Sequence, residues 1–207
     1  MLALKNRIEV VERITAEEFF AFAPETEKAE LIEGVMIVSP PPLDSHEKQN
    51  LFLLRLLSEY VEQQGLGEVR GSRTAVRLSE AHVFEPDILF LSEERSHLLQ
   101  ERGVFGPPDL VVEILSASTA MYDRGDKLRA YERFGVQEVW LIDPYGPSGT
   151  LFYRQEEGLF VPMPVDNDGW LVSTALPGFQ LQTDWLWPQE KFVPLVEALA
   201  AVQARRG

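Results

Sequence analysis

The sequence predicts an α/β (α+β) protein in which a mixed β-sheet is flanked by helices. Two nearly continuous apolar stretches, 88–91 and 110–115, are typical of strands that are covered on both faces. Segments with helical spacing alternate with the strand-like ones, and hairpin-like pieces follow Pro144. At 207 residues, 45% of them apolar, the chain is long enough to bury a substantial core.

The bulk composition limits the possible chemistry. The absence of cysteine excludes a disulfide framework and thiolate ligands, so any bound metal is expected to be a hard cation. Charged residues interrupt the first fourteen positions, which argues against a signal peptide or membrane span and predicts a cytoplasmic protein. A net charge of −14 disfavours long-range attraction to a polyanion, although Arg70, Arg73 and Arg77 form a local basic cluster.

One domain is expected over residues 1–207, with a core at about 28–145 and a C-terminal β extension at about 146–190. The first expected helix, 15–22, begins with a capping box formed by Thr15 and Glu18. A strand is expected at 31–38 and must end at the Ser-Pro-Pro-Pro run that follows it.

The first long helix is expected from a second capping box, Asp44 and Glu47, to about Gln64. A later helix is expected at 123–134, beginning with a capping box of Asp123 and Asp126 and stopping at Gly135. The remaining strand-like segments are 73–78, 83–91, 110–115 and 138–142, followed by hairpin-like pieces at 151–154, 159–161 and 170–173.

Two acids interrupt apolar strands. Asp87 precedes the run 88–91, and Glu113 lies within 110–115. Burying an ionised carboxylate is unfavourable unless a cation or hydrogen-bond donors compensate it, and a metal ion would do so. For each residue alone, a salt bridge or a solvent-reaching position at the strand end is an equally good interpretation.

Lys127 belongs to the apolar stripe of its helix. Tyr131 and Phe134 lie four and seven residues further on, at about 40° and −20° around the helix axis. An anionic partner inside the fold would explain a lysine there, and a snorkelling lysine with a solvated ammonium is the alternative. Replacing Lys127 with alanine is expected to abolish any activity that depends on this residue while leaving the fold nearly intact or slightly stabilised.

Asp87, Glu113 and Lys127 together supply what metal-dependent phosphodiester hydrolysis needs, namely ligands and a cation near the developing charge. Hard cations held by one or two carboxylates are Mg²⁺ or Mn²⁺, and the backbone carbonyl of Ile114 is a further candidate ligand. His46 should point inward from its helix, either as a site residue or as a satisfied core histidine. Glu33 is a candidate third carboxylate or a strand-end charge.

These positions together resemble the Uma2 (Uma-two) family, a branch of the PD-(D/E)XK, restriction-endonuclease-like superfamily. The resemblance covers nearly the whole chain through the order and spacing of its motifs. They are Glu30-Leu31-Ile32-Glu33-Gly34, Ser45-His46, Glu85-Pro86-Asp87-Ile88, the stretch from Pro108 to Thr119, Asp123, Lys127-Leu128, Tyr131, Gly135-Val136 and Trp140-Leu141-Ile142-Asp143-Pro144.

The resemblance implies a restriction-endonuclease-like fold with Asp87 and Glu113 as metal ligands. In the superfamily pattern a lysine follows the second acid by two residues, and Leu115 stands at that place here. The resemblance implies that the role of this lysine has moved to Lys127. It also suggests Glu33 and His46 as peripheral site residues.

The leading functional hypothesis is a Mg²⁺- or Mn²⁺-dependent endonuclease that hydrolyses phosphodiester bonds of DNA. One alternative is a catalytically inactive interaction module that keeps the nuclease-like fold, favoured by the charge of −14 and by Leu115. Another is a metal-dependent hydrolase of a different phosphate ester, since no base-reading motif is visible. A homodimer is expected, because superfamily members often cut two strands with paired sites.

Overall fold

The computed structural model describes residues 12–24 and 26–205. Within these residues the strands form two six-stranded sheets and one two-stranded sheet. The first large sheet has the order β2-β1-β5-β4-β8-β7 and is called here the amino-terminal sheet. Its strands are β1 (Lys28–Ile32), β2 (Val35–Ser39), β4 (Val76–Ser79), β5 (His82–Phe84), β7 (Leu99–Gln100) and β8 (Gly103–Phe105).

The second large sheet, called the central sheet, has the order β12-β11-β10-β9-β6-β3. Only its β9–β10 pair is parallel, so the sheet is mixed, as expected from the sequence. Its strands are β3 (Gly67–Gly71), β6 (Ile88–Ser92), β9 (Leu110–Ile114), β10 (Glu138–Ile142), β11 (Leu151–Glu156) and β12 (Leu159–Pro162).

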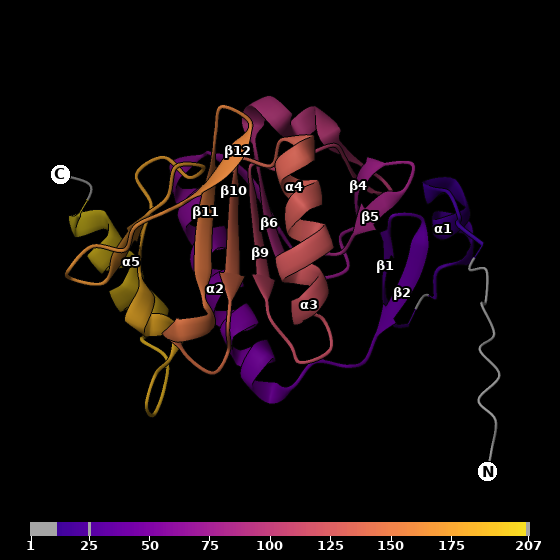
Figure 1. Ribbon diagram of the computed structural model, residues 1–207. Helices are drawn as coiled ribbons and strands as arrows, with labels where there is room; N and C mark the ends of the chain where they lie inside the picture. The colour runs from indigo at the N-terminus through magenta and orange to yellow at the C-terminus, as the bar shows by residue number, and fades with distance from the viewer. Residues whose placement is uncertain (1–11, 25, 206–207) are drawn as a thin grey trace, which may run out of the picture.

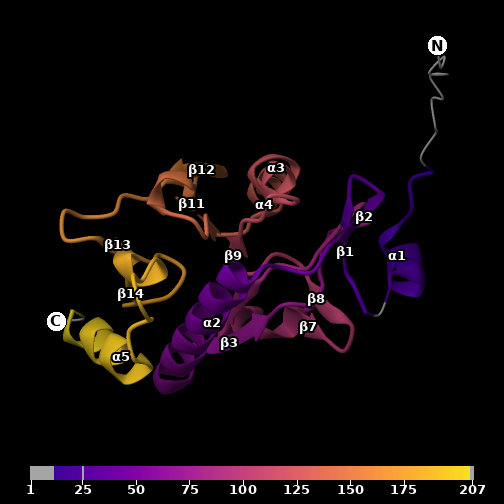
Figure 2. The same cartoon turned by 90° about the horizontal axis from the view of Figure 1, so that it is seen from below.

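Helices cover both faces of the central sheet (Figure 2). Helix α2 (Asp44–Gln64) packs on one face, and the helical segment formed by α3 (Ala120–Tyr122), a π-helical turn at Asp123–Lys127 and α4 (Leu128–Phe134) lies on the other. Since side chains alternate along a strand, the even-numbered residues of β9 face α2 and the odd-numbered ones face α4. Glu113 therefore points toward α4.

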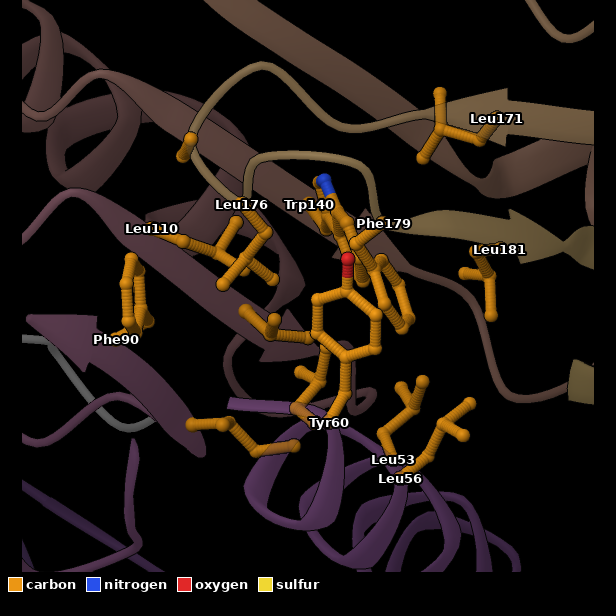
Figure 3. Packing of buried hydrophobic residues seen from close by; sticks show 14 of the residues in the cluster. Leu53, Leu56, Tyr60, Phe90, Leu110, Trp140, Leu171, Leu176, Phe179 and Leu181 are labelled. Carbon is orange, nitrogen blue, oxygen red and sulfur yellow. The ribbon is translucent and has the colours of Figure 1, made fainter. Parts of the chain in front are cut away.

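The larger core lies on the α2 side of the central sheet (Figure 3). The Tyr60 ring of α2 meets Phe179 edge to face with centroids 4.9 Å apart, and its hydroxyl donates to the Pro177 carbonyl at 2.8 Å. Each such fully buried aromatic side chain stabilises the fold by about 2–3 kcal/mol. This core therefore fixes the C-terminal segment against α2.

The C-terminal hairpins expected from the sequence are present, with one difference. Strands β11 and β12 extend the central sheet, whereas β13 (Trp170–Val172) pairs with β14 (Gln180–Gln182) in a sheet of its own. Helix α5 (Leu195–Ala204), which the sequence analysis did not predict, packs on α2 beside this hairpin (Figures 1 and 2). Short 3-10 turns occupy Glu93–Leu98, Pro147–Gly149 and Thr183–Leu186.

The expected strand at 31–38 is wrong in its extent, because it is a hairpin. Strands β1 and β2 pair antiparallel around Glu33 and Gly34, which adopt φ values of 52° and 80°. Two successive positive φ angles characterise a two-residue hairpin turn, for which glycine at the second position is favourable. The apolar residues on both sides of this turn concealed it in the sequence.

The expected strand at 83–91 is also wrong, because it is two strands in different sheets. Strand β5 belongs to the amino-terminal sheet and β6 to the central sheet, with Glu85, Pro86 and Asp87 crossing between them. Proline has no N–H to donate to a ladder, so a strand pairing breaks at this point. The crossover places Asp87 at the junction of the two sheets.

Helix starts were predicted with mixed success. The Thr15–Glu18 capping box at α1 (Ala16–Phe22) is confirmed, as is the left-handed Gly135 that ends α4. The Asp44–Glu47 box is wrong, since Leu43 is the N-cap and no side chain caps α2. The Asp123–Asp126 box is also wrong, because the chain is already helical from Ala120 and Asp123 is buried.

In the part of the chain that the structure describes, no helix combines the length and apolar character needed to cross a membrane.

Candidate metal-dependent nuclease site

Asp87 lies directly before β6, and Glu113 lies in the neighbouring strand β9. Strands β6 and β9 are antiparallel with Ile88 opposite Val112, and extending that register by one residue places Asp87 opposite Glu113. The Ile114 backbone N–H donates to Asp87 Oδ2 at 2.8 Å, which fixes the Asp87 carboxylate at the end of β9. Both acids are buried, with 2% and 1% of their surface exposed.

Lys127 reaches this region from the π-helical turn. Its Nζ lies 2.7 Å from Glu113 Oε1, 2.8 Å from Glu30 Oε1 and 3.0 Å from Asp123 Oδ1, and the lysine side chain is 1% exposed. The sequence prediction of an anionic partner inside the fold is thus confirmed, and the structure supplies three. Tyr131, one helical turn further on, donates its hydroxyl to Glu113 Oε1 at 2.6 Å.

A second lysine contacts the other acid. Lys28 Nζ on β1 lies 3.1 Å from Asp87 Oδ1, and its side chain is 24% exposed, in contrast to the enclosed Lys127. His46, in the first turn of α2, points inward as expected and places Nε2 3.1 Å from Asp87 Oδ2. Its Nδ1 lies 3.3 Å from Glu47 Oε1 without hydrogen-bond alignment. Asp87 therefore joins β1, α2 and β9.

The cluster holds more negative than positive groups. Five buried carboxylates, those of Glu30, Glu85, Asp87, Glu113 and Asp123, share this cluster with the enclosed ammonium of Lys127 and the partly exposed ammonium of Lys28. The Glu85 backbone N–H donates to Glu30 Oε1, which ties the crossover to this cluster. Among the described residues, Glu85 Oε2 is buried without a hydrogen-bond partner. The excess of negative charge favours binding of a cation.

The pKa shifts follow from this arrangement. Burial raises the pKa of Glu113 to about 8, although the Lys127 ammonium opposes that rise. Burial would also raise the pKa of Asp87. The effects of Lys28 and His46 are larger, however, and hold the pKa of Asp87 well below its ordinary value. Burial also opposes charge on Lys127, yet the Asp123, Glu113 and Glu30 carboxylates hold the pKa of Lys127 well above its ordinary range. Asp87 is therefore ionised at neutral pH, while Glu113 can retain a proton.

The donor set fits a magnesium-like cation better than a zinc-like one. Within residues 12–24 and 26–205, no three His, Asp or Glu side chains converge as a ready-made ligand group. Two adjacent carboxylates with a nearby backbone carbonyl, completed by water, are nevertheless a normal Mg²⁺ environment. The excess of buried carboxylates supports the same assignment, with Asp87, Glu113 and the Ile114 carbonyl as the residues that would hold the ion.

Comparison with known proteins places the chain in a family. The sequence model of the Uma2 family, described as "Putative restriction endonuclease", matches residues 16–184. The chain belongs to the Uma2 family. Asp87, Glu113 and Lys127 all lie within the matched region.

Two relatives illustrate the sequence and fold similarity. The uncharacterized protein sll1609 of Synechocystis sp. is 30% identical over 135 residues, which are 64% of this chain and 76% of the relative. A crystal structure of a putative nuclease belonging to DUF820 from Anabaena variabilis aligns with a TM-score of 0.64 at 18% identity, covering 91% of this chain and 99% of the other. At that identity the match shows a shared fold alone, which agrees with the fold class that the sequence predicted.

The other predicted Uma2 site residues lie at varying distances from this centre. His46 and Ile114 contact Asp87 directly. Glu33 occupies the β1–β2 turn with a side chain 58% exposed, and its described contact is with His82 Nε2 at 3.3 Å. Leu115 is buried in the core beneath α4, so its side chain supports the helix that carries Lys127.

Sequence analysis missed four members of the cluster, namely Lys28, Glu30, Glu85 and Asp123. Lys28 and Glu30 are two residues apart on β1 and so share a strand face, a signal that was hidden because the expected strand began at Leu31. Asp123 was interpreted as a helix cap, although its spacing of four from Lys127 also allowed an ion pair inside the fold. Glu30 was present in the motif, but Glu33 was chosen instead.

Proposed function

We propose that this Uma2 protein is a divalent-metal-dependent endonuclease that hydrolyses phosphodiester bonds of DNA. The observation that carries the proposal is a buried cluster with excess negative charge, in which Asp87, directly before β6, and Glu113 of the neighbouring strand β9 each contact a lysine. When bound there, Mg²⁺ or Mn²⁺ would polarise the phosphate and lower the pKa of a ligand water.

Asp87 and Glu113 are the proposed ligands, and their orientation is set by neighbouring groups. Asp87 is held by the Ile114 N–H, His46 and Lys28, whereas Glu113 is held by Tyr131 and Lys127. Since catalytic geometry depends on such supporting contacts, His46 and Tyr131 are proposed as positioning residues.

The two lysines have different proposed roles. Lys127 is enclosed by three carboxylates and is 1% exposed, so it acts through Glu113 as a positioning residue. Lys28 contacts one carboxylate and is 24% exposed, so its ammonium is the one placed to meet a substrate phosphate oxygen. A cation at that point would stabilise the negative charge that develops during hydrolysis.

Cleavage assays with supercoiled, linear duplex and single-stranded DNA test the proposal. Wild-type protein is expected to cut at least one form with Mg²⁺ or Mn²⁺ and none with EDTA, and Asp87→Asn and Glu113→Gln should reduce cleavage by about 100-fold or more. Calorimetric titration with Mn²⁺ gives a readout independent of turnover, in which both variants should lose affinity. Absence of both cleavage and Mn²⁺ binding in the wild type would refute the proposal.

The variant Lys28→Met distinguishes the proposed role of Lys28 from that of the carboxylate ligands. Cleavage should fall, because the exposed cation is lost, while Mn²⁺ affinity should be kept or increased, because Lys28 no longer competes for Asp87 Oδ1. A loss of Mn²⁺ affinity equal to that of Glu113→Gln would instead make Lys28 a structural support of the ligands.

A further inference from the structure

A cavity lined by arginines adjoins the acidic cluster. Its volume is about 350 Å³, and its charged lining consists of Arg70, Arg73, Arg102 and Glu101. Three positive groups against one negative group are a local reversal of charge in a chain of net −14. Arg70 and Arg73 belong to the basic cluster noted in the sequence, whereas Arg102 comes from the loop between β7 and β8.

Arg70 forms an ion pair with Glu68, whereas the other two arginines have no acidic partner. Arg73 donates to the carbonyl oxygens of Pro24 and Glu27, and Arg102 donates to the Phe20 carbonyl at 2.9 Å. Among the described residues, neither guanidinium forms an ion pair within 4 Å. Arg73 also has a φ of 73°, a conformation that non-glycine residues seldom adopt and that occurs often at binding sites.

The cavity lies at the same end of the central sheet as Asp87. Gly71 at the end of β3 pairs with Ile88 at the start of β6, and the Ser72 hydroxyl donates to the Asp87 carbonyl at 3.4 Å. The loop at 70–73 therefore connects the arginine-lined cavity with the proposed ligand.

We infer that this cavity binds a backbone phosphate of the nucleic-acid strand whose neighbouring phosphodiester lies at Asp87 and Glu113. The inference rests on the proposed function and adds to it a substrate-binding site outside the metal-dependent centre. Guanidinium groups recognise phosphate oxygens through paired, charge-assisted hydrogen bonds, and such contacts fix the register of a strand without reading its sequence. The cavity thereby offers a way for an acidic protein to hold a polyanion locally.

The test is binding of labelled single-stranded and duplex oligonucleotides, followed by fluorescence anisotropy in EDTA. The variant Arg70→Ser/Arg102→Ser is compared with Arg129→Ser/Arg133→Ser, which removes the same charge from exposed positions of α4. The cavity variant should bind about tenfold or more weakly at low salt, with a salt slope shallower by about 1–2 units. The control should stay within about twofold of wild type.

Two additional measurements separate weakened binding from a damaged fold and from a site for free phosphate. Thermal melting identifies any loss of fold from removing the Arg102–Phe20 contact, and in that event Arg70→Ser alone, at a 44% exposed side chain, should still weaken binding. Equal weakening in both double variants, or in neither, overturns the inference. So does binding of inorganic phosphate as tight as that of the oligonucleotide, because the site would then serve free phosphate.

Cleavage by the same preparations with Mn²⁺ separates this inference from the proposed function. If wild type cuts DNA and the cavity variant binds it normally, the cavity inference fails while the function stands. If wild type binds through the arginines but cuts nothing with any metal, the function fails while the cavity remains a nucleic-acid site. If wild-type protein binds no oligonucleotide, the cavity inference fails. The cleavage assay then tests the proposed function independently.

Discussion

Lys127 shows how one buried cation organises several acids. Its Nζ contacts Glu30, Glu113 and Asp123, which come from β1, β9 and the π-helical turn. In contrast, the buried Glu138 is satisfied by neutral donors, among them Trp140 Nε1 at 2.7 Å and the Ala175 N–H at 2.9 Å. Buried acids in this protein therefore have two kinds of compensation: neutral donors at Glu138, and cationic side chains at Asp87 and at the acids around Lys127.

Lys127→Met is expected to destabilise the protein by about 3–5 kcal/mol, because it leaves three buried carboxylates without their common cation. This reverses the sequence-based expectation of a nearly intact fold. Lys28→Met should lower stability by only about 1 kcal/mol, since Asp87 keeps His46 and the Ile114 N–H. Urea unfolding of both variants measures the difference, and equal losses would contradict the distinct roles of the two lysines.

The pKa of Glu113 predicts an unusual pH dependence for the metal-free protein. A carboxyl whose folded pKa is raised to about 8 from 4.5 favours folding below its unfolded pKa, and this stability is lost as pH rises through about 8. The raised pKa of His46 acts in the same direction, whereas the lowered pKa of Asp87 matters only in more acidic solution. Unfolding free energy should therefore fall by a few kcal/mol between about pH 5.5 and about pH 8.5.

Urea unfolding in EDTA across that range measures this dependence. Glu113→Gln should flatten most of the slope, because the titrating group is gone while the side chain keeps its size. A wild-type stability that rises over the same interval would show that Glu113 is ionised in the folded protein throughout.

At the scale of elements, the π-helical turn at Asp123–Lys127 sets the phase of the helical segment. A π-helical turn contains one residue more than an α-helical turn, so it changes the angle between side chains that precede it and side chains that follow it. Such turns occur often at functional sites. Here the result is that Asp123, Lys127 and Tyr131 all point toward Glu113. The turn is therefore part of how the site is built.

Two changes at Gly125 test the importance of this phase. A Cβ at Gly125 would meet nothing within 4 Å, so Gly125→Ala should stabilise the helical segment by up to about 1 kcal/mol and keep Mn²⁺ binding. Deletion of Gly125 should convert the turn to regular helix and shorten the spacing between Asp123 and Lys127 from four residues to three, which changes the angle between the two side chains and should weaken Mn²⁺ binding. Circular dichroism checks that helix is retained, and a deletion variant with unchanged Mn²⁺ affinity would show that the phase is unimportant.

The crossover at 85–87 is the second element that builds the site. It carries the chain from the amino-terminal sheet to the central sheet, so that Lys28 and Glu30 of β1 meet Asp87 and Glu113 of the central sheet. Neither sheet alone contains the full cluster. Changes that loosen this junction should therefore affect the site before they affect the larger core around α2.

At the scale of the whole molecule, self-association remains a proposal. Strand β12 is an edge of the central sheet, and its Leu159 is 63% exposed. Edge strands present unpaired backbone groups that a second copy can pair with, and a symmetric dimer would bring two sites to one duplex. We predict a dimer in sedimentation velocity at micromolar concentration, with Leu159→Lys shifting it toward monomer. A monomer across that range would contradict the prediction.

The distribution of charge is also a property of the whole molecule. The excess of acid is partly concentrated in the buried cluster, where a bound cation would offset it, and two guanidiniums without an acidic partner, those of Arg73 and Arg102, line one cavity. Net charge therefore describes long-range repulsion, whereas local contacts at close range decide where a strand is held.

The sequence by itself determined the features that depend on local pattern. Periodicity identified α2, β9 and β10, the capping box identified α1, and the apolar stripe correctly placed Lys127 inward. These succeed because hydrophobic spacing and cap chemistry act between residues close in the chain. The order of motifs likewise identified the Uma2 family.

Only the tertiary structure decided which acids share which cation. Lys28 meets Asp87 across 59 residues of chain, and Lys127 meets Glu30 across 97. Such contacts depend on strand register and on the crossing between two sheets, which local patterns do not specify. For that reason the contacts of Glu30 and Lys28 became visible only once the two sheets were placed against each other, whereas the inward position of Asp87, Glu113 and Lys127 could be predicted from their apolar neighbours.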